Sequence, residues 1–291
     1  MKRPPLAANW TTLVSADELA AAIDDCVVVD CRHDLLDHGA GRRAYGEGHI
    51  PSAFFMDMET ELSGPKTGRN GRHPLPDRDA LRERLATLGL DDDRQLVAYD
   101  AHGGAMAVRL WCLARWLGHR KVAVLDGDLR AWRAAGYPVT SEPASPPSQP
   151  GRLDPNRAPL VDLVTAGDVV GALGSQRMLV IDARAPERYS GQTEPMDPVA
   201  GHIPGALNRF FGLNLRPDGR FKPAPVLRAE LLALLGDRDP GVVVHQCGSG
   251  VTACHNLLAM EHAGLSGARL YVGSWSEWVA DPGRPVARDA A

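Results

Sequence analysis

A cysteine followed by two glycines is the residue of this chain best suited to do chemistry. Cys247 comes after the short apolar run at residues 242–244, and Gly248 and Gly250 follow it closely. The pattern predicts a buried strand, then a tight loop, then a helix that continues to Met260. Glycines let such a loop curl until its backbone N–H groups converge on one point. Those groups and the positive end of the helix dipole favour a thiolate, so the loop predicts a nucleophilic cysteine.

An internal repeat supplies a comparison for this loop. Four short segments recur in the same order along the chain, which indicates a duplicated domain. The paired segments are residues 13–18 and 163–168, 28–32 and 180–184, 48–51 and 201–204, and 127–132 and 273–278. The last pair is offset by 146 residues (273 − 127), and this offset aligns Cys247 with Ala101. The first copy keeps glycines in its loop but has no nucleophile, so we expect only the second copy to be catalytic.

The elements that must position the loop are strands and helices in alternation. Short apolar runs, such as residues 26–30, 96–99 and 242–244, are separated by stretches with helical periodicity. Such alternation predicts an α/β fold in which each copy is a parallel sheet with helices on both faces. Ligands of these sheets bind beyond the carboxyl ends of the strands, where Cys247 stands.

A proline-rich stretch separates the two copies. Residues 141–150 contain four prolines, which excludes a helix or a central strand there. We therefore predict a non-catalytic domain over residues 1–140, a Pro-rich linker over 141–158 and a catalytic domain over 159–291. A length of 291 residues suits two domains of ordinary size.

Composition and charge exclude several classes of protein. Hydrophobic residues make up 44% of the chain, which is enough for two cores and argues against disorder. A net charge of −4 gives no basic field for nucleic acid or a membrane surface, and no apolar stretch is long enough to span a membrane. Residues 1–5 are basic but lack the apolar segment of a signal peptide. Five cysteines do not suggest a disulfide framework, so we expect a cytoplasmic protein.

At these residues the chain resembles the tandem-domain rhodaneses, a family of sulfurtransferases. The resemblance covers nearly the whole chain: both GHIP segments, the Cys247 loop, and an aspartate–arginine pair at a strand end in each copy, which we interpret as a structural ion pair. It implies two rhodanese-like domains and a reaction without a metal or organic cofactor. The loop sequence CGSGVTA is similar to that of 3-mercaptopyruvate sulfurtransferases. Thiosulfate-using members instead place two basic residues directly after the cysteine.

The resemblance implies a role for each part of the loop. Cys247 would take the outer sulfur of 3-mercaptopyruvate as a persulfide and release pyruvate. A thiol, such as that of a thioredoxin, or cyanide would then accept the sulfur. The backbone N–H groups of Gly248, Gly250, Val251 and Thr252 would hold the anionic persulfide.

The resemblance also implies roles for side chains around the loop. Arg188 matches the arginine that binds the substrate carboxylate, a task suited to a guanidinium fork. Ser249 matches the serine of a serine–histidine–acid relay that moves a proton to the enolate of pyruvate. His73 matches the histidine and Glu59 lies near the position of the acid, with Asp57 as the alternative. Since the histidine and the acid come from the first copy, the site would lie at the domain interface.

One departure from the family affects the choice of substrate. The mercaptopyruvate enzymes often carry a second arginine nine residues after the first, and Asp197 stands at that position here. Only Arg209 or Arg216, folding back, would replace the missing charge. A thiosulfate sulfurtransferase is therefore the alternative to a 3-mercaptopyruvate sulfurtransferase.

Other interpretations of the cysteine are weaker. Cysteine phosphatases of a related fold need an arginine six positions after the nucleophile, where this chain has Ala253. A zinc site made from His245, Cys247, Cys254 and His255 would have no familiar spacing, so we expect no metal there. A non-catalytic persulfide carrier would share the cysteine but would not need the arginine and the relay residues together.

Overall fold

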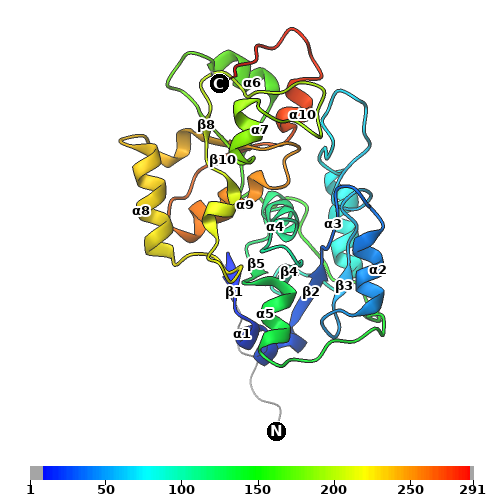
Figure 1. Cartoon of the computed structure of the whole chain (residues 1–291). Coiled ribbons are helices and arrows are strands. Elements are labelled where there is room, and N and C mark those ends of the chain that lie inside the picture. Colours follow the sequence, from blue (N-terminus) through cyan, green and yellow to red (C-terminus); the bar gives the residue numbers. More distant parts are fainter. Residues whose placement is uncertain (1–8, 289–291) are drawn as a thin grey trace. The chain divides into compact units, whose positions relative to one another are not determined.

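The computed structural model of the chain describes residues 9–288 (Figure 1). The basic residues 1–5, on which the signal-peptide interpretation rests, lie outside the described residues. The chain forms two compact units. The first comprises the residues up to Leu62, Pro76–Leu160 and Pro217–Phe221, and the second comprises Ser63–Leu75, Val161–Arg216 and the chain from Lys222 onward. Ser63–Leu75 thus belongs to the second unit, although the chain on both sides of it belongs to the first. Pro217–Phe221 belongs to the first unit, although the chain on both sides of it belongs to the second.

A five-stranded parallel sheet forms the centre of the first unit. Its strands, in the spatial order β1-β5-β4-β2-β3, are β1 (Leu13–Val14), β2 (Cys26–Asp30), β3 (Phe54–Phe55), β4 (Gln95–Tyr99) and β5 (Val122–Leu125). The helices are α1 (Ala16–Ala22), α2 (Ala40–Glu47), α3 (Arg78–Thr87), α4 (Ala107–Trp116) and α5 (Asp128–Ala134), with a short 3₁₀ helix η1 (Ile23–Asp25).

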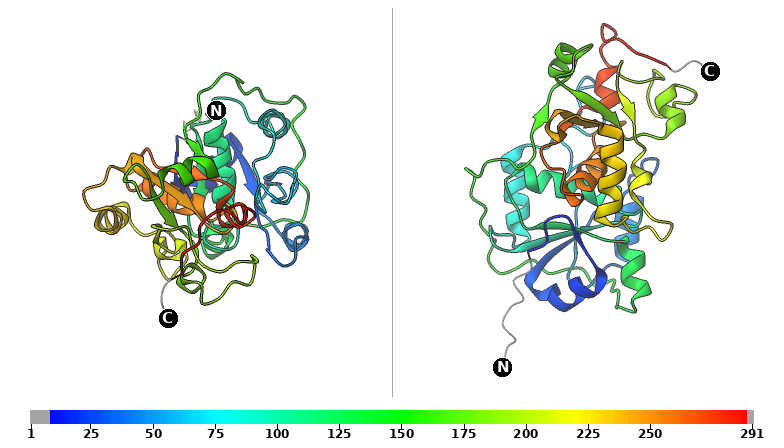
Figure 2. Two further views of the ribbon diagram at one scale, coloured as in Figure 1. Left: turned by 90° about the horizontal axis from the view of Figure 1, so that it is seen from above. Right: turned by 90° about the vertical axis from the view of Figure 1, so that its left-hand side faces the viewer.

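The second unit repeats this topology. Its strands, in the order β6-β10-β9-β7-β8, are β6 (Leu163–Val164), β7 (Leu179–Asp182), β8 (Leu207–Asn208), β9 (Val243–Gln246) and β10 (Arg269–Tyr271). The helices are α6 (Ala166–Ala172), α7 (Pro186–Ser190), α8 (Ala224–Leu235), α9 (Ala253–His262) and α10 (Ser274–Trp278), with 3₁₀ helices η2 (Phe211–Asn214) and η3 (Pro240–Val242). Helices flank the sheet of each unit (Figure 2). The predicted duplication and α/β fold are confirmed.

Local sequence signals explain where these elements begin. Every residue of β2 and β4 is buried, as expected for strands covered by helices on both faces. Helix α1 begins with a capping box in which Ser15 and Glu18 satisfy each other's backbone N–H groups, and Thr165 and Asp168 do the same for α6. The two copies therefore share helix caps as well as strand order.

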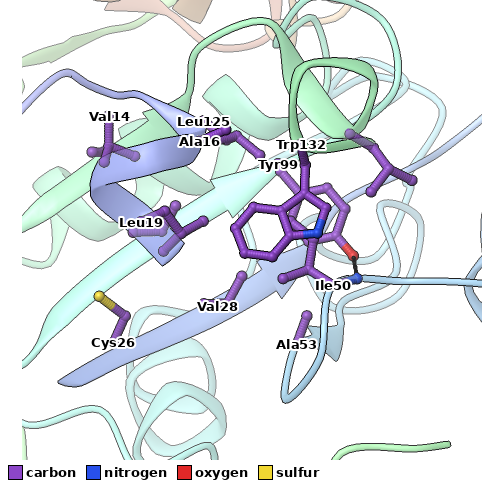
Figure 3. Packing of buried hydrophobic residues seen from close by; sticks show 13 residues of the cluster. Val14, Ala16, Leu19, Cys26, Val28, Ile50, Ala53, Tyr99, Leu125 and Trp132 are labelled. Atoms are coloured by element: carbon purple, nitrogen blue, oxygen red, sulfur yellow. Dashed lines mark hydrogen bonds between the residues drawn. The ribbon is translucent and has the colours of Figure 1, made fainter. Parts of the chain in front are cut away.

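Each unit has its own hydrophobic core. In the first unit, Leu19, Val28 and Trp132 pack around Tyr99, whose hydroxyl accepts a hydrogen bond from the Ile50 N–H at 3.2 Å (Figure 3). In the second unit, the corresponding cluster contains the buried side chains of Ile203, Tyr271, Trp275 and Trp278. These cores hold the sheets rigid, so the loops at the strand ends have fixed supports.

The aspartate–arginine pairs tie each sheet to its GHIP segment. Arg32 pairs with Asp30 at 2.6 Å and donates to the Gly48 carbonyl oxygen at 2.9 Å. Arg184 pairs with Asp182 at 2.7 Å and makes the matching bond to the second GHIP segment. All four side chains are buried. Their interpretation as structural ion pairs is confirmed.

The Pro-rich segment over residues 141–158 contains no helix or strand and packs with the first unit. Within residues 9–288, no helix is both long and apolar enough to cross a membrane.

Candidate active site

Cys247 lies in the loop that joins strand β9 to helix α9. Its side chain is buried, with 1% of the residue exposed. The backbone N–H of Gly250 donates a hydrogen bond to Cys247 Sγ at 3.2 Å. Gly250 has φ +79°, and a Cβ on it would lie 2.1 Å from the Val272 carbonyl oxygen, so no other residue fits there. This glycine permits the turn that aims an N–H group at the sulfur.

The other N–H groups of the loop are open to a ligand. Within the described part of the chain, the N–H groups of Gly248, Ser249, Val251 and Thr252 donate to no protein acceptor. They come just before the first turn of α9, where helix N–H groups carry partial positive charge. The geometry therefore suits an anion beside the sulfur. That this anion is a persulfide stays a prediction.

The first residues of helix α10 hold the cysteine loop in place. The N–H of Cys247 donates to Ser274 Oγ at 3.1 Å, and the N–H of Ser276 donates to the Gly248 carbonyl oxygen at 2.9 Å. Ser274 has φ +53°, which is uncommon for a residue other than glycine. The sequence analysis gave neither serine a role. The internal repeat marks the position of Ser274, because the offset of 146 aligns it with Asp128, whose φ is also positive, at +56°.

Ser249 and His73 are in contact. His73 Nδ1 lies 2.7 Å from Ser249 Oγ, and both side chains are buried. Both residues belong to the second unit, because Ser63–Leu75 packs with that unit rather than with the preceding chain. The structure thus brings together two members of the predicted relay. Their part in proton transfer stays a prediction.

The two candidate acids of the relay, Glu59 and Asp57, belong to the first unit. Asp57 Oδ1 accepts a hydrogen bond from the Glu59 N–H at 2.9 Å and so closes a turn. Glu59 Oε1 lies 3.5 Å from His33 Nε2 and 3.8 Å from His38 Nε2. The choice between the two acids as the partner of His73 stays a prediction.

His33, His38 and Glu59 form a group of side chains of the kind that can bind a metal. Their ligand atoms all lie within 4.8 Å of one another. Burial lowers the pKa of His33, which favours the neutral imidazole that metals require. The sequence analysis did not consider this group, which contains no residue of the Cys247 loop.

Arg188, in the middle of the short helix α7, lies beside the Cys247 loop. A Cβ on Gly248 would be 3.4 Å from Arg188 Nη2 and 3.6 Å from Nη1. The guanidinium is fixed by Glu194, which accepts from Nε at 3.2 Å and from Nη2 at 2.6 Å. Arg188 therefore lies near the residue that follows Cys247, and its role in binding the substrate stays a prediction. Glu194, which orients it, was missed by the sequence analysis.

Asp197 connects this arginine to a second one. Asp197 Oδ2 lies 3.4 Å from Arg188 Nη2, and its other oxygen makes a short ion pair with Arg72 Nη1. Burial raises the pKa of Asp197, and Arg72 is the strongest of the charges that oppose this rise. The expectation that only Arg209 or Arg216 would replace the missing cation is wrong. Arg209 pairs elsewhere, with Glu230 at 3.0 Å, and Arg72 occupies the place beside Asp197.

Comparison with protein families matches the rhodanese-like domain to residues 15–135 and 165–281. These two matches fall in the two repeated α/β copies, the second of which contains the cysteine loop. The chain belongs to the rhodanese-like family and carries two copies of its domain. The fold and family that the sequence predicted are confirmed.

The similar proteins have names that divide between two sulfur donors. A Pseudomonas aeruginosa protein, 48% identical over 94% of this chain and 97% of its own length, is named "Probable 3-mercaptopyruvate sulfurtransferase". A Rattus norvegicus protein, 36% identical over 81% of this chain and 79% of its own length, is named thiosulfate sulfurtransferase. The solved structure of 3-mercaptopyruvate sulfurtransferase from Leishmania major has a TM-score of 0.81 and 29% identity, and covers 95% of this chain and 75% of its own. All three names are those of sulfurtransferases.

Proposed function

We propose that this chain is a sulfurtransferase that moves a sulfur atom from 3-mercaptopyruvate through a persulfide on Cys247 to a thiol or to cyanide. Sulfur transfer as the class of reaction follows from the family and from the names of its full-length relatives. The observation that carries the assignment to this site is the loop itself. Its sulfur accepts a hydrogen bond from the Gly250 N–H, and the other N–H groups of residues 248–252 donate to no protein acceptor among the described residues.

In the first half-reaction, the Cys247 thiolate attacks the sulfur of 3-mercaptopyruvate. A bond forms between the two sulfur atoms, and the carbon–sulfur bond of the substrate breaks. The electron pair of the broken bond leaves on carbon as the enolate of pyruvate, which then takes up a proton. The open N–H groups of the loop would hold the anionic persulfide that remains on the enzyme.

Two neighbouring groups support this half-reaction. Ser249 Oγ, hydrogen-bonded to His73, would donate the proton that the enolate needs and recover it through the histidine. Arg188, beside Gly248, would bind the carboxylate of the substrate and so hold its sulfur at the cysteine.

In the second half-reaction, an acceptor attacks the outer sulfur of the persulfide. The sulfur–sulfur bond breaks and the thiolate of Cys247 is restored. A thiol acceptor, such as that of a thioredoxin, becomes a persulfide, and cyanide becomes thiocyanate. All five cysteines of the chain are thiols, which supports a reducing, cytoplasmic location.

Thiosulfate is the second candidate donor. Its outer sulfur would pass to Cys247 in the same way, with sulfite leaving with the electron pair. Two guanidinium groups beside Gly248 favour a dianion, and the rat relative is named for this donor. The neutral loop residues Gly248 and Ser249 and the Ser249–His73 contact favour 3-mercaptopyruvate, because only an enolate needs a proton on carbon.

The test is kcat/KM for 3-mercaptopyruvate and for thiosulfate, measured side by side with cyanide as the common acceptor. We expect a large excess for 3-mercaptopyruvate, and no turnover by Cys247→Ser with either donor. A preference for thiosulfate would keep the nucleophile but overturn the substrate. Activity with neither donor would contradict the proposal and favour a persulfide carrier.

A further inference from the structure

We propose that His33, His38 and Glu59 form a binding site for a divalent transition-metal ion, in the first place Zn²⁺. All three residues belong to the first unit, and none belongs to the Cys247 loop. A metal here would not be a cofactor of sulfur transfer, so this inference does not rest on the proposed function. Two imidazoles and a carboxylate are a usual ligand set of zinc sites whose fourth ligand is water.

The sheet topology brings two of these residues together. Strands β2 and β3 are parallel neighbours, with Asp30 opposite Phe55. His33 comes shortly after the end of β2, and Glu59 comes shortly after the end of β3. Because the carboxyl ends of parallel strands meet at the same edge of a sheet, both residues lie at the edge where α/β sheets bind ligands.

A short turn brings His38 back to His33. The carboxylate of Asp34 accepts hydrogen bonds from the backbone N–H groups of Leu36 at 2.7 Å and of Asp37 at 3.0 Å. The chain closed by these bonds stacks the two imidazole rings, whose centroids are 5.5 Å apart and whose planes are inclined by 30°. The turn therefore sets the spacing of two nitrogen ligands.

The distances between the ligand atoms are close to those of a metal site. Glu59 Oε1 lies 3.5 Å from His33 Nε2 and 3.8 Å from His38 Nε2, and the three ligand atoms lie within 4.8 Å of one another. Tetrahedral zinc, with bonds of about 2.0–2.1 Å, separates its ligand atoms by roughly 3.3 Å. Small side-chain rotations would bring all three atoms within bonding distance of one ion, which needs only one of the two carboxylate oxygens.

Exposure and charge suit the entry of a cation. The side chain of His38 is 56% exposed, that of Glu59 is 14% exposed and that of His33 is 2% exposed. An ion can thus reach the site from the side of His38 and bind to the two less exposed ligands. The carboxylates of Asp34 and Asp57 lie near enough to act electrostatically on His33, and they add negative charge around the site.

The second copy of the domain lacks these ligands. The offsets of the aligned segments place Ala185 at the position of His33 (185 − 33 = 152) and Gly212 at the position of Glu59 (212 − 59 = 153). The fold therefore requires neither a histidine nor a glutamate there. Their presence in the copy without the nucleophile indicates a separate use of the same edge of the sheet.

The test is zinc binding by the full chain. Protein freed of metal is titrated with Zn²⁺ in competition with a chromophoric chelator, in a Cys247→Ser background so that the loop thiolate does not bind the ion. The principal variant adds His38→Gln, which changes an exposed side chain and leaves the core intact. The matched control adds His102→Gln, which changes an exposed histidine in the loop after β4 of the same unit.

We expect the background protein and the His102→Gln control to bind one zinc ion per chain. His38→Gln should bind zinc about 100-fold more weakly or worse, because loss of a direct ligand should exceed the roughly 10- to 100-fold cost of losing an outer partner. The melting temperature should rise with zinc concentration in the two proteins that bind the ion. Equal zinc affinity in His38→Gln and the control, or no zinc binding by any of them, would overturn the inference.

Cobalt(II) provides a second readout that identifies the ligands. Bound Co²⁺ should show d–d absorption bands without the charge-transfer band of a thiolate ligand, because the site contains only nitrogen and oxygen donors. Glu59→Gln, which removes the charge of the carboxylate and keeps its size, should weaken cobalt binding as His38→Gln does. A thiolate charge-transfer band in the Cys247→Ser background would place the ion at another cysteine and contradict the proposed site.

Discussion

The loops that follow β4 and β9 stand at equivalent positions in the two copies of the domain, but their backbone N–H groups have different partners. In the first copy, the carboxylate of Asp100 accepts hydrogen bonds from four backbone N–H groups of the loop that follows β4, at 2.7–3.0 Å. In the second copy, the residue at the equivalent position is Gln246 (246 − 146 = 100). In that loop the N–H of Gly250 donates to Cys247 Sγ, and no carboxylate among the described residues accepts from the N–H groups of Gly248, Ser249, Val251 or Thr252.

The two loops therefore differ in whether a carboxylate of the chain itself accepts their N–H groups. The carboxylate of Asp100 already accepts four of the N–H groups of the first loop. The side chain of Gln246 is buried, and neither of its polar atoms has a hydrogen-bond partner in the described part of the chain. The amide at this position therefore accepts none of the N–H groups of the second loop.

The largest predicted effect comes from giving the second loop the aspartate that the first loop has at the position of Gln246. In Gln246→Asp, the new carboxylate should accept the loop N–H groups as Asp100 does and repel an anionic donor. We expect kcat/KM to fall by about 1000-fold, the scale of losing the donors of an oxyanion site. Gln246→Asn, which has the same size without the charge, should lose far less, and both are measured by steady-state kinetics. Equal losses in the two variants would contradict the comparison.

The next effect concerns the hydroxyl that distinguishes the second loop from the first, where Gly103 takes the place of Ser249. Ser249→Ala should lower kcat with 3-mercaptopyruvate by roughly 100-fold, because the enolate loses its proton donor. The loss with thiosulfate should be much smaller, since sulfite leaves without protonation on carbon. Parallel kcat measurements with the two donors decide the point, and equal losses would argue against a relay.

Substitution of Arg188 should have a smaller effect, which falls on KM rather than on kcat. Arg188→Ala should raise KM for 3-mercaptopyruvate about 10-fold or more and change kcat less, because the bond to the carboxylate is lost in ground state and transition state alike. The exposed Arg177 provides a matched control, and Arg177→Ala should behave as wild type. Unchanged KM in Arg188→Ala would remove this residue from the site.

The last effect is on stability rather than on activity, and it separates the two units by their response to acid. Burial lowers the pKa of His245 on β9 from 6.5 to about 3, and the aligned residue of the first unit is Tyr99. The unfolded chain binds a proton on this histidine below about pH 6.5, while the folded chain does not until about pH 3. Stability should therefore fall as the pH decreases through this interval. Denaturant unfolding at several pH values should show a weaker fall for His245→Leu, and an identical pH dependence would contradict this assignment.

Features encoded locally or repeated along the chain were predictable from the sequence. The strands, the capping boxes, the duplication and the cysteine loop all follow from periodicity, composition or the offset of 146 residues. The contacts that complete the site were not predictable, because they join segments far apart in the chain. Arg72 reaches Asp197 across 125 residues and Ser276 across 204 residues. No local pattern marks Ser63–Leu75 as a part of the second unit.

The exchange of Asp100 for Gln246 is visible in the sequence itself. Aligning Asp100 with Gln246 needs only the offset that aligned Ala101 with Cys247. The role of Asp100 can be recognised only in the structure, because an aspartate at a strand end has many possible hydrogen-bond partners. Only the four N–H groups that it accepts identify it as an internal anion.

The most direct test of the central claim is the mass of the protein after incubation with 3-mercaptopyruvate in the absence of an acceptor. We expect one added sulfur atom, located on the Cys247 peptide and released by cyanide, which is absent from Cys247→Ser and forms far more slowly in Gln246→Asp. Sulfur found on another cysteine, or an unmodified Cys247 in a protein that still turns over the donor, would contradict it.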